Sequence, residues 1–144
     1  MGKDSVNISA PNLVNICVDS IYSGVYHGRL YHKYQQEPLR FNDVGALFQT
    51  MEKLFDECGY PQNTTQSRTF YRKKEKSVIK EMVPDIDVTD MLNQRGKLAT
   101  FIVHVKYRQH STWQGEVLWV EKNKKENFRS ALDFLKLMDY VLEA

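Results

Sequence analysis

The sequence predicts an α+β fold in which two β-β-α units contribute to one antiparallel sheet, with two helices packed on one face. Two pairs of stretches alternate between apolar and polar residues, as half-buried strands do, and each pair precedes a segment with the apolar spacing of an amphipathic helix. The first unit is expected at residues 12–57 and the second at 98–144, around a basic, weakly patterned insert at 58–97. The chain of 144 residues, 1–144, is long enough for a single domain with a real core.

The first unit opens with an expected hairpin. Residues 13–22 alternate between apolar and polar side chains, and Ser23-Gly24 is a turn signal. Residues 25–34 alternate again, so the two stretches are expected to pair. The sequence QQEP at 35–38 predicts a further turn.

A helix follows, with Asp43 as the expected N-cap. Gly59 is the expected C-cap, and Pro61 prevents continuation. Between the caps, apolar residues recur at the spacing of one helical face. They are Val44, Leu47, Phe48, Met51, Leu54 and Phe55.

The insert has the weakest pattern and the most basic charge. Residues 58–84 contain six basic and two acidic side chains, whereas residues 1–57 contain five basic and seven acidic ones. RTFYRKK and SVIKEMV are expected to form a short hairpin, and PDIDVTDMLNQRG a loop with one turn of helix. A secondary basic patch is expected at the tip of the hairpin, where it would contact phosphates or an acidic protein surface, or stay in solvent. Its residues are Arg72, Lys73, Lys74 and Lys76.

The second unit repeats the pattern of the first. Residues 98–108 and 113–121 alternate as strands, and KNKKEN predicts a turn. Ser130 is the expected N-cap of the last helix, and Asp133 would complete a capping box. The apolar stripe of this helix consists of Ala131, Phe134, Leu135, Met138, Val141 and Leu142.

A shift of 87 residues aligns the two units without a gap, which predicts a pseudo-repeat. The shift places hairpin on hairpin, N-cap on N-cap and apolar stripe on apolar stripe. Four residues fall on identical partners: Val18, Gly28, Phe41 and Met51.

If the helices cover one face of the sheet, alternation leaves basic and aromatic side chains on the other. These candidate ligand- or partner-binding residues are Arg29, Tyr31, Lys33, His104, Lys106 and Arg108. Cations interleaved with an aromatic ring can hold phosphates and stack a base. The same pattern also fits a solvated polar face or the interface of a homodimer.

No motif for catalysis, a metal or a cofactor is present in the sequence. The four histidines lack the spacing of a zinc site, and the two cysteines have no CxxC spacing. No apolar run approaches the length of a membrane span, and the first residues lack a secretory apolar region. A cytoplasmic protein without a cofactor and without enzymatic activity is therefore expected.

The C-terminal pattern WQGEVLW…FRSALDFLKLMDYVL resembles one found in small bacterial proteins, some carried on mobile elements. This resemblance covers about the last forty residues and implies no activity and no site residue. The expected fold is also similar to single-stranded nucleic-acid-binding proteins of the Whirly and Pur type, whose units have four strands before each helix.

The function expected from these observations is that of an accessory or regulatory binding protein. It would recruit, inhibit or sequester a protein partner or a small anionic ligand, as a homodimer. The alternative is a protein that binds single-stranded DNA or RNA through the basic-aromatic face, with an affinity that falls steeply with salt.

Overall fold

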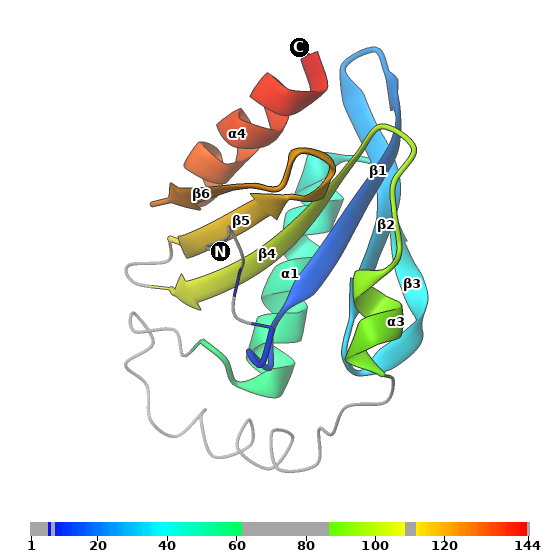
Figure 1. The fold of residues 1–144 in the computed structure, drawn as a ribbon. Helices are drawn as coiled ribbons and strands as arrows, with labels where there is room; N and C mark the ends of the chain where they lie inside the picture. Colours follow the sequence, from blue (N-terminus) through cyan, green and yellow to red (C-terminus); the bar gives the residue numbers. More distant parts are fainter. Residues whose placement is uncertain (1–5, 7, 62–86, 109–111, 144) are drawn as a thin grey trace.

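The structure, a computed structural model, describes residues 6, 8–61, 87–108 and 112–143 and shows an antiparallel sheet with helices (Figure 1). Six strands form the sheet in the order β3-β2-β1-β4-β5-β6. The strands are β1 (Val14–Tyr22), β2 (Val25–His32), β3 (Gln35–Phe41), β4 (Ala99–Tyr107), β5 (Gln114–Trp119) and β6 (Lys124–Phe128). The helices are α1 (Val44–Cys58), α3 (Val88–Leu92), the short 3-10 turn η2 (Val120–Lys122) and α4 (Ala131–Glu143). The α+β class with an antiparallel sheet is thus as the sequence predicts.

The main departure from expectation is a third strand before each long helix. The predicted turn at QQEP belongs to β3, and most of the predicted turn KNKKEN belongs to η2 and β6. Both strands are polar and lie at the edges of the sheet, so their sequences lack the alternation of inner strands. Each ends on a buried phenylalanine, Phe41 or Phe128, which ties it to the core.

The ends of α1 confirm the predicted caps. The carboxylate of Asp43 accepts a hydrogen bond from Ala46 N–H, and Gly59 is left-handed with φ of 72°. At the start of α4, Ser130 Oγ accepts from Asp133 N–H at 2.9 Å, and the Asp133 carboxylate accepts from Arg129 N–H. The predicted turn of helix within the insert is α3, whereas the predicted hairpin lies outside the described residues.

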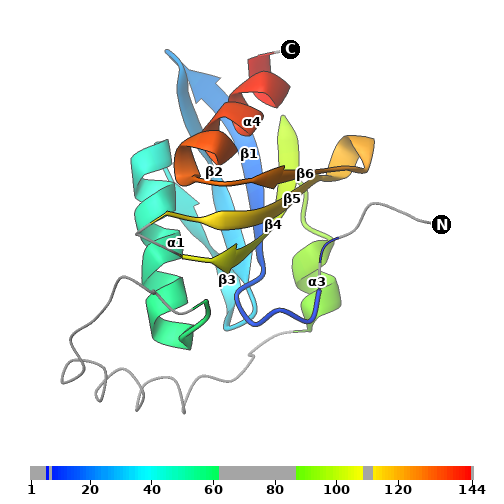
Figure 2. The same cartoon turned by 90° about the vertical axis from the view of Figure 1, so that its left-hand side faces the viewer.

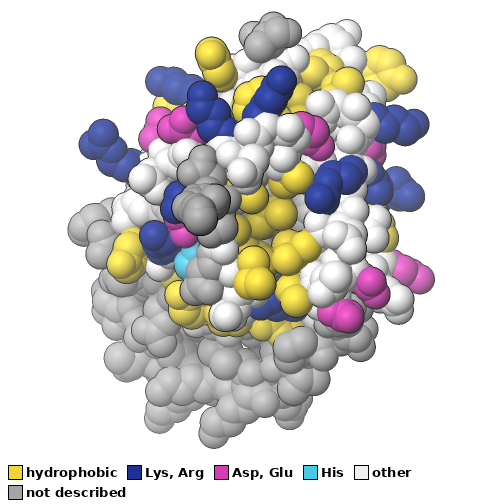
Figure 3. Space-filling model, viewed as in Figure 1, with side chains coloured by type: hydrophobic (Ala, Val, Ile, Leu, Met, Phe, Trp, Pro, Cys, Tyr) yellow, Lys and Arg dark blue, Asp and Glu magenta, His cyan; other side chains and the backbone are white. Residues whose placement is uncertain are grey.

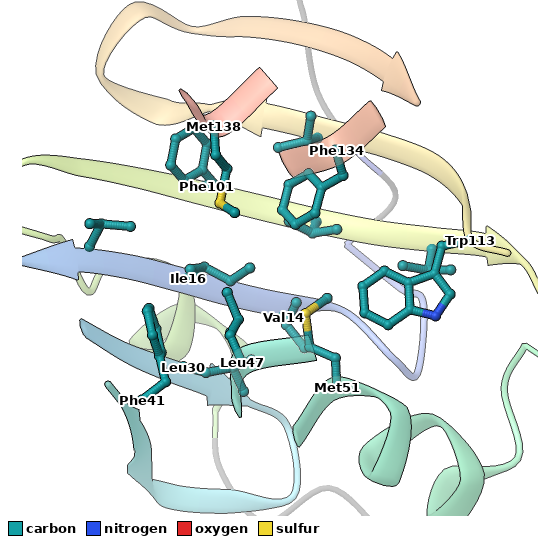
Figure 4. Packing of buried hydrophobic residues seen from close by; sticks show 14 of the residues in the cluster. Val14, Ile16, Leu30, Phe41, Leu47, Met51, Phe101, Trp113, Phe134 and Met138 are labelled. Carbon is teal, nitrogen blue, oxygen red and sulfur yellow. The ribbon is translucent and has the colours of Figure 1, made fainter. Parts of the chain in front are cut away.

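One core cluster joins the sheet to both long helices (Figure 4). Leu47 and Met51 of α1 and Phe134 and Met138 of α4 belong to it. From the inner strands it takes Val14, Ile16, Val18, Phe101, Val103 and Val105. The contacts are those expected from the two apolar stripes, because alternation places every second residue of an inner strand on one face.

The opposite face of the sheet carries a second, smaller cluster. Leu13, which immediately precedes β1, and Met91 of α3 are fully buried there against Tyr31 and Ile102. Figure 2 shows α3 and the N-terminal segment on the opposite side of the sheet from α1. The sheet therefore has no fully open face, and its inner strands are buried on both sides.

The strand registers of the two halves coincide under the shift of 87 residues except near the β2–β3 turn, where His32 pairs with Gln35 but Trp119 pairs with Lys124. Val18 pairs with Gly28, which pairs with Phe41; likewise Val105 pairs with Gly115, which pairs with Phe128. The register slips after Val18 in β1 and after Val105 in β4, so a bulge stands at the corresponding place in both strands. In the central β1–β4 pair, Asn15 lies opposite Ile102, and these residues are themselves 87 apart.

Two hydrogen bonds tie the long helices to the sheet at corresponding places. Trp113 Nε1 donates to the carboxylate of Glu52 on α1, and Tyr26 Oη donates to the carboxylate of Asp139 on α4. The two donors lie 87 residues apart in the sequence, and so do the two acceptors. Each bond joins one half of the chain to the other, so each helix is held by the strands of the opposite half.

Gly115 should be intolerant of any side chain. An added Cβ would lie 2.1 Å from the backbone oxygen of His104, a contact that requires β4 and β5 to separate. We expect Gly115→Ala to lower the free energy of unfolding by about 3 kcal/mol in urea denaturation. In Gly45→Ala the nearest neighbouring atom would be 3.3 Å away, and alanine favours a helix, so this control should match the wild type closely. Equal stability of the two variants would contradict the strand packing described here.

Candidate functional site

The structure separates the six candidate residues of the predicted basic-aromatic face into three groups. Tyr31 belongs to the smaller core cluster, and Arg29 lies beside it. Arg108 lies against α1. Lys33, His104 and Lys106 lie near one end of the sheet. The secondary basic patch, Arg72, Lys73, Lys74 and Lys76, lies outside the described residues. Figure 3 shows the face that carries α3, with hydrophobic side chains in its middle and Lys and Arg side chains around them.

Arg29 and Tyr31 are engaged inside the protein. The Arg29 guanidinium is ion-paired with Asp19, with Nε 2.9 Å from Oδ2, and also donates to Arg95 O. Tyr31 is only 8% exposed, and its hydroxyl accepts from Arg29. Burial would raise the pKa of Asp19, but hydrogen bonds from Arg29 and from Lys97 N–H outweigh it and lower that pKa. These contacts hold the chain after α3 against the sheet.

Arg108 lies on the face of the sheet opposite to the one that alternation predicts. The bulge after Val105 reverses the alternation, so the guanidinium reaches α1 instead of joining His104. It is ion-paired with Glu52 and Asp56, both at 2.9 Å, and Nε donates to Pro61 O. Its Cζ atom lies 5.6 Å from the centroid of the Phe55 ring. A buried cation with these partners secures the end of α1.

The third group forms what we name the end cluster. It comprises Lys33, Tyr60, His104, Lys106, Glu116 and Lys125. His104 of β4 stands directly opposite Glu116 of β5, and Lys33 directly follows the last residue of β2. Tyr60, just beyond α1, places its ring nearly parallel to the His104 imidazole, with 6.2 Å between centroids.

Glu116 is the centre of the end cluster. Its side chain is 8% exposed, and Oε1 lies 3.1 Å from Lys125 Nζ. Oε2 lies 3.7 Å from Lys106 Nζ and 3.8 Å from His104 Nδ1. A buried carboxylate is costly unless it is paired, and here ammonium groups from two strands supply the compensation.

His104 is the least satisfied polar side chain of the end cluster. It is 4% exposed, and no described residue lies within hydrogen-bond distance of either ring nitrogen. Burial lowers the pKa of His104; Glu116 opposes the shift, and the nearby Lys106 and Lys33 add to it. The ring is therefore neutral at pH 7; Nδ1 lies 3.8 Å from Glu116 Oε2, and neither nitrogen has a hydrogen bond to a described residue.

Lys33 is buried as well, and burial lowers the pKa of its ammonium group. Its Nζ donates to Ile8 O at 2.9 Å. Lys106 and Lys125 form the accessible rim, with side chains 41% and 34% exposed. Within the described residues the cluster thus combines three ammonium groups with one carboxylate.

Sequence reasoning did not include Glu116, Lys125 or Tyr60 among the candidates. Glu116 could have been found, because alternation places it on the same face as His104 and directly across the hairpin. Lys125 fell in a predicted turn, which is in fact β6. Tyr60 meets His104 only through the way the chain leaves α1, which no local pattern encodes.

Comparisons with known proteins return no match: no protein-family model, no curated protein and no solved structure resembles this chain. Within residues 6, 8–61, 87–108 and 112–143, no group of three or more His, Cys, Asp or Glu side chains is arranged to hold a metal ion. In the same part of the chain, no helix has the length and apolar character required to cross a bilayer.

Replacing Arg108 should destabilise the protein. Arg108→Ala removes two ion pairs and the hydrogen bond to Pro61, but Glu52 and Asp56 are partly exposed and are not stranded. We therefore expect a loss of about 2 kcal/mol in the free energy of unfolding, less than for a fully buried pair. Arg40→Ala, at an exposed position of edge strand β3, is the control and should change stability by less than about 0.5 kcal/mol. Equal effects of both variants would contradict the anchoring role.

Acid should weaken the fold in a way that depends on His104. Its folded pKa is lowered, so near and below pH 6.5 the unfolded chain binds a proton that the folded protein does not. The free energy of unfolding should therefore fall as pH is lowered from 7 toward the folded pKa. Urea denaturation between pH 7 and 5 should give a shallower slope for His104→Gln. Burial also lowers the pKa of His32, so His32→Gln with His104→Gln should be flatter still. A slope unaffected by either variant would exclude buried neutral imidazoles.

Proposed function

We propose that this protein works by binding rather than by catalysis, and that its ligand is a small anion held at the end cluster. The observation that carries the proposal is His104, a buried neutral imidazole whose ring nitrogens make no hydrogen bond to a described residue and which lies beside three ammonium groups. Buried polar groups in folded proteins are nearly always paired, so an unpaired one favours a missing partner. In this role the protein recruits, inhibits or sequesters other molecules.

An anion with several oxygen atoms matches the donors of the end cluster. Lys106 and Lys125 offer ammonium groups at the rim, where a ligand can exchange hydrating water for N–H donors. The N–H of His104 lies deeper and would donate to a second oxygen of the same ligand. Because the Tyr60 ring covers the imidazole, the ligand reaches it only when that ring turns aside.

A binding role is favoured over nucleophilic catalysis by the state of the two thiols. Burial raises the pKa of Cys17 to about 11 and also raises the pKa of Cys58. The reactive form of cysteine is the thiolate, so both side chains are inert at neutral pH. Neither cysteine belongs to the end cluster.

Single-stranded nucleic acid is a poorer match than a small anion. Stacking requires an aromatic ring that a base can reach, and Tyr31 is buried in the second core cluster. Arg29, the cation beside it, is already paired with Asp19. Both residues would have to leave their present partners to bind a strand.

We further propose that the two halves of the chain are an internal pseudo-repeat of β-β-β-α units, with α1 and α4 on one face of the sheet. The coincident registers and bulges and the two helix-holding hydrogen bonds support this view. Self-association as a homodimer and a cytoplasmic location complete the proposal.

The test is calorimetric titration of the intact protein with inorganic phosphate and pyrophosphate at low salt. We expect binding that weakens at least about tenfold in Lys106→Ala with Lys125→Ala, since charge-assisted hydrogen bonds are lost. The matched control replaces the exposed Lys122 and Lys136, which lie outside the end cluster, and should bind as the wild type does.

His104→Gln tests the contribution of the His104 N–H to binding separately from that of the rim ammonium groups. It should weaken binding without altering the number of ammonium groups. Equal binding by the end-cluster variant and the control would refute the site. A separate anisotropy titration uses labelled single-stranded DNA and RNA. Binding of either nucleic acid without binding of phosphate would contradict the proposal.

A further inference from the structure

A cavity of about 330 Å³ lies between the β2–β3 hairpin and α1, on the opposite side of the sheet from the end cluster. Apolar and polar side chains share its wall. They are His32, Tyr34, Gln35, Leu39, Thr50, Lys53, Leu54 and Glu57. This volume falls at the low end of the range of small-molecule sites, and the wall is more polar than most of them.

His32 places a defined hydrogen-bond donor on this wall. Its Nδ1 accepts from Tyr34 N–H at 3.0 Å, so the ring proton resides on Nε2. Burial lowers the pKa of His32 and keeps the ring neutral. The Nε2–H group makes no hydrogen bond to a described residue. The imidazole is thus oriented by one nitrogen and has a donor to spare at the other.

The corresponding positions of the second half carry different side chains. The residue 87 positions after His32 is Trp119, whose indole packs against the main core cluster. Thr50 and Lys53 correspond to Leu137 and Tyr140 in the same way. The first half therefore has a smaller ring and two polar side chains where the second half has an indole, a leucine and an exposed tyrosine.

We propose that this cavity binds a small monocarboxylic acid with an apolar body. The Nε2–H of His32, the Thr50 hydroxyl and the Lys53 ammonium supply the donors that a carboxylate accepts. Leu39 and Leu54 supply apolar surface for the rest of the molecule. Glu57 at the same wall repels a second negative charge, which distinguishes this site from the proposed phosphate-binding end cluster. The inference does not depend on that earlier proposal.

The probes are phenylacetate and its neutral amide, titrated into the isotopically labelled full chain and followed by amide chemical shifts. We expect shifts in β2, β3 and α1, with phenylacetate binding at least about tenfold more tightly than phenylacetamide. Lys53→Gln, at an exposed position of α1, should remove this preference, while the matched Lys122→Gln should keep it. Binding without a preference for the acid would overturn the proposed ligand class.

His32→Trp tests the cavity itself by copying the residue of the second half. The indole should fill the space and abolish the shifts with both probes, without lowering the thermal midpoint. His27→Trp, on the same strand but outside the cavity wall, should leave binding unchanged. Failure of phenylacetate to bind the wild type at millimolar concentration would overturn the proposal, as would unchanged binding to a folded His32→Trp protein. Should that variant not fold, the Lys53→Gln comparison decides alone.

Discussion

The pairing of β1 with β4 is the constraint on which the rest of the structure depends. It joins strands that are far apart in sequence, opposing Val14–Val18 to Ala99–Val103. Without it each half would be a three-stranded sheet with one helix and an exposed apolar edge, too small to bury its own core. With it, the central strands contribute to both clusters, the main one with residues of α1 and α4 and the smaller one with Met91 of α3.

Burial of both faces explains why so many polar side chains of the inner strands serve the structure. Asn15 donates to Met91 O and Gln94 O, and the Thr100 hydroxyl donates to Glu121. Each of these polar groups pairs within the protein because an unpaired one would cost about 1–3 kcal/mol. Among the described residues, only the His104 ring nitrogens and Asn12 Oδ1 are buried without a hydrogen bond.

The differences between the halves are as informative as the correspondence. Where the first half has Ile21 packed against the core, the second has Arg108 bound to the acids of α1. Where the second half has Trp119, the first has His32 and a cavity. If the two halves are the internal repeat proposed above, substitutions on one copy are free to create sites that the other copy does not need.

Local patterns in the sequence determined much of this protein. Alternation located β1, β2, β4 and β5, and apolar stripes with caps located α1 and α4, because those features depend on neighbouring residues alone.

Only the tertiary structure decided what covers the second face and which side chains meet. The polar edge strands β3 and β6 form because β2 and β5 offer backbone partners, whatever their own composition. The bulge after Val105 moves Arg108 to the other face, and α3 buries Tyr31, so the predicted basic-aromatic face divides. Alternation places Glu116 across the hairpin from His104, whereas Lys125 and Tyr60 join His104 through contacts between segments that leave no periodic trace in the sequence.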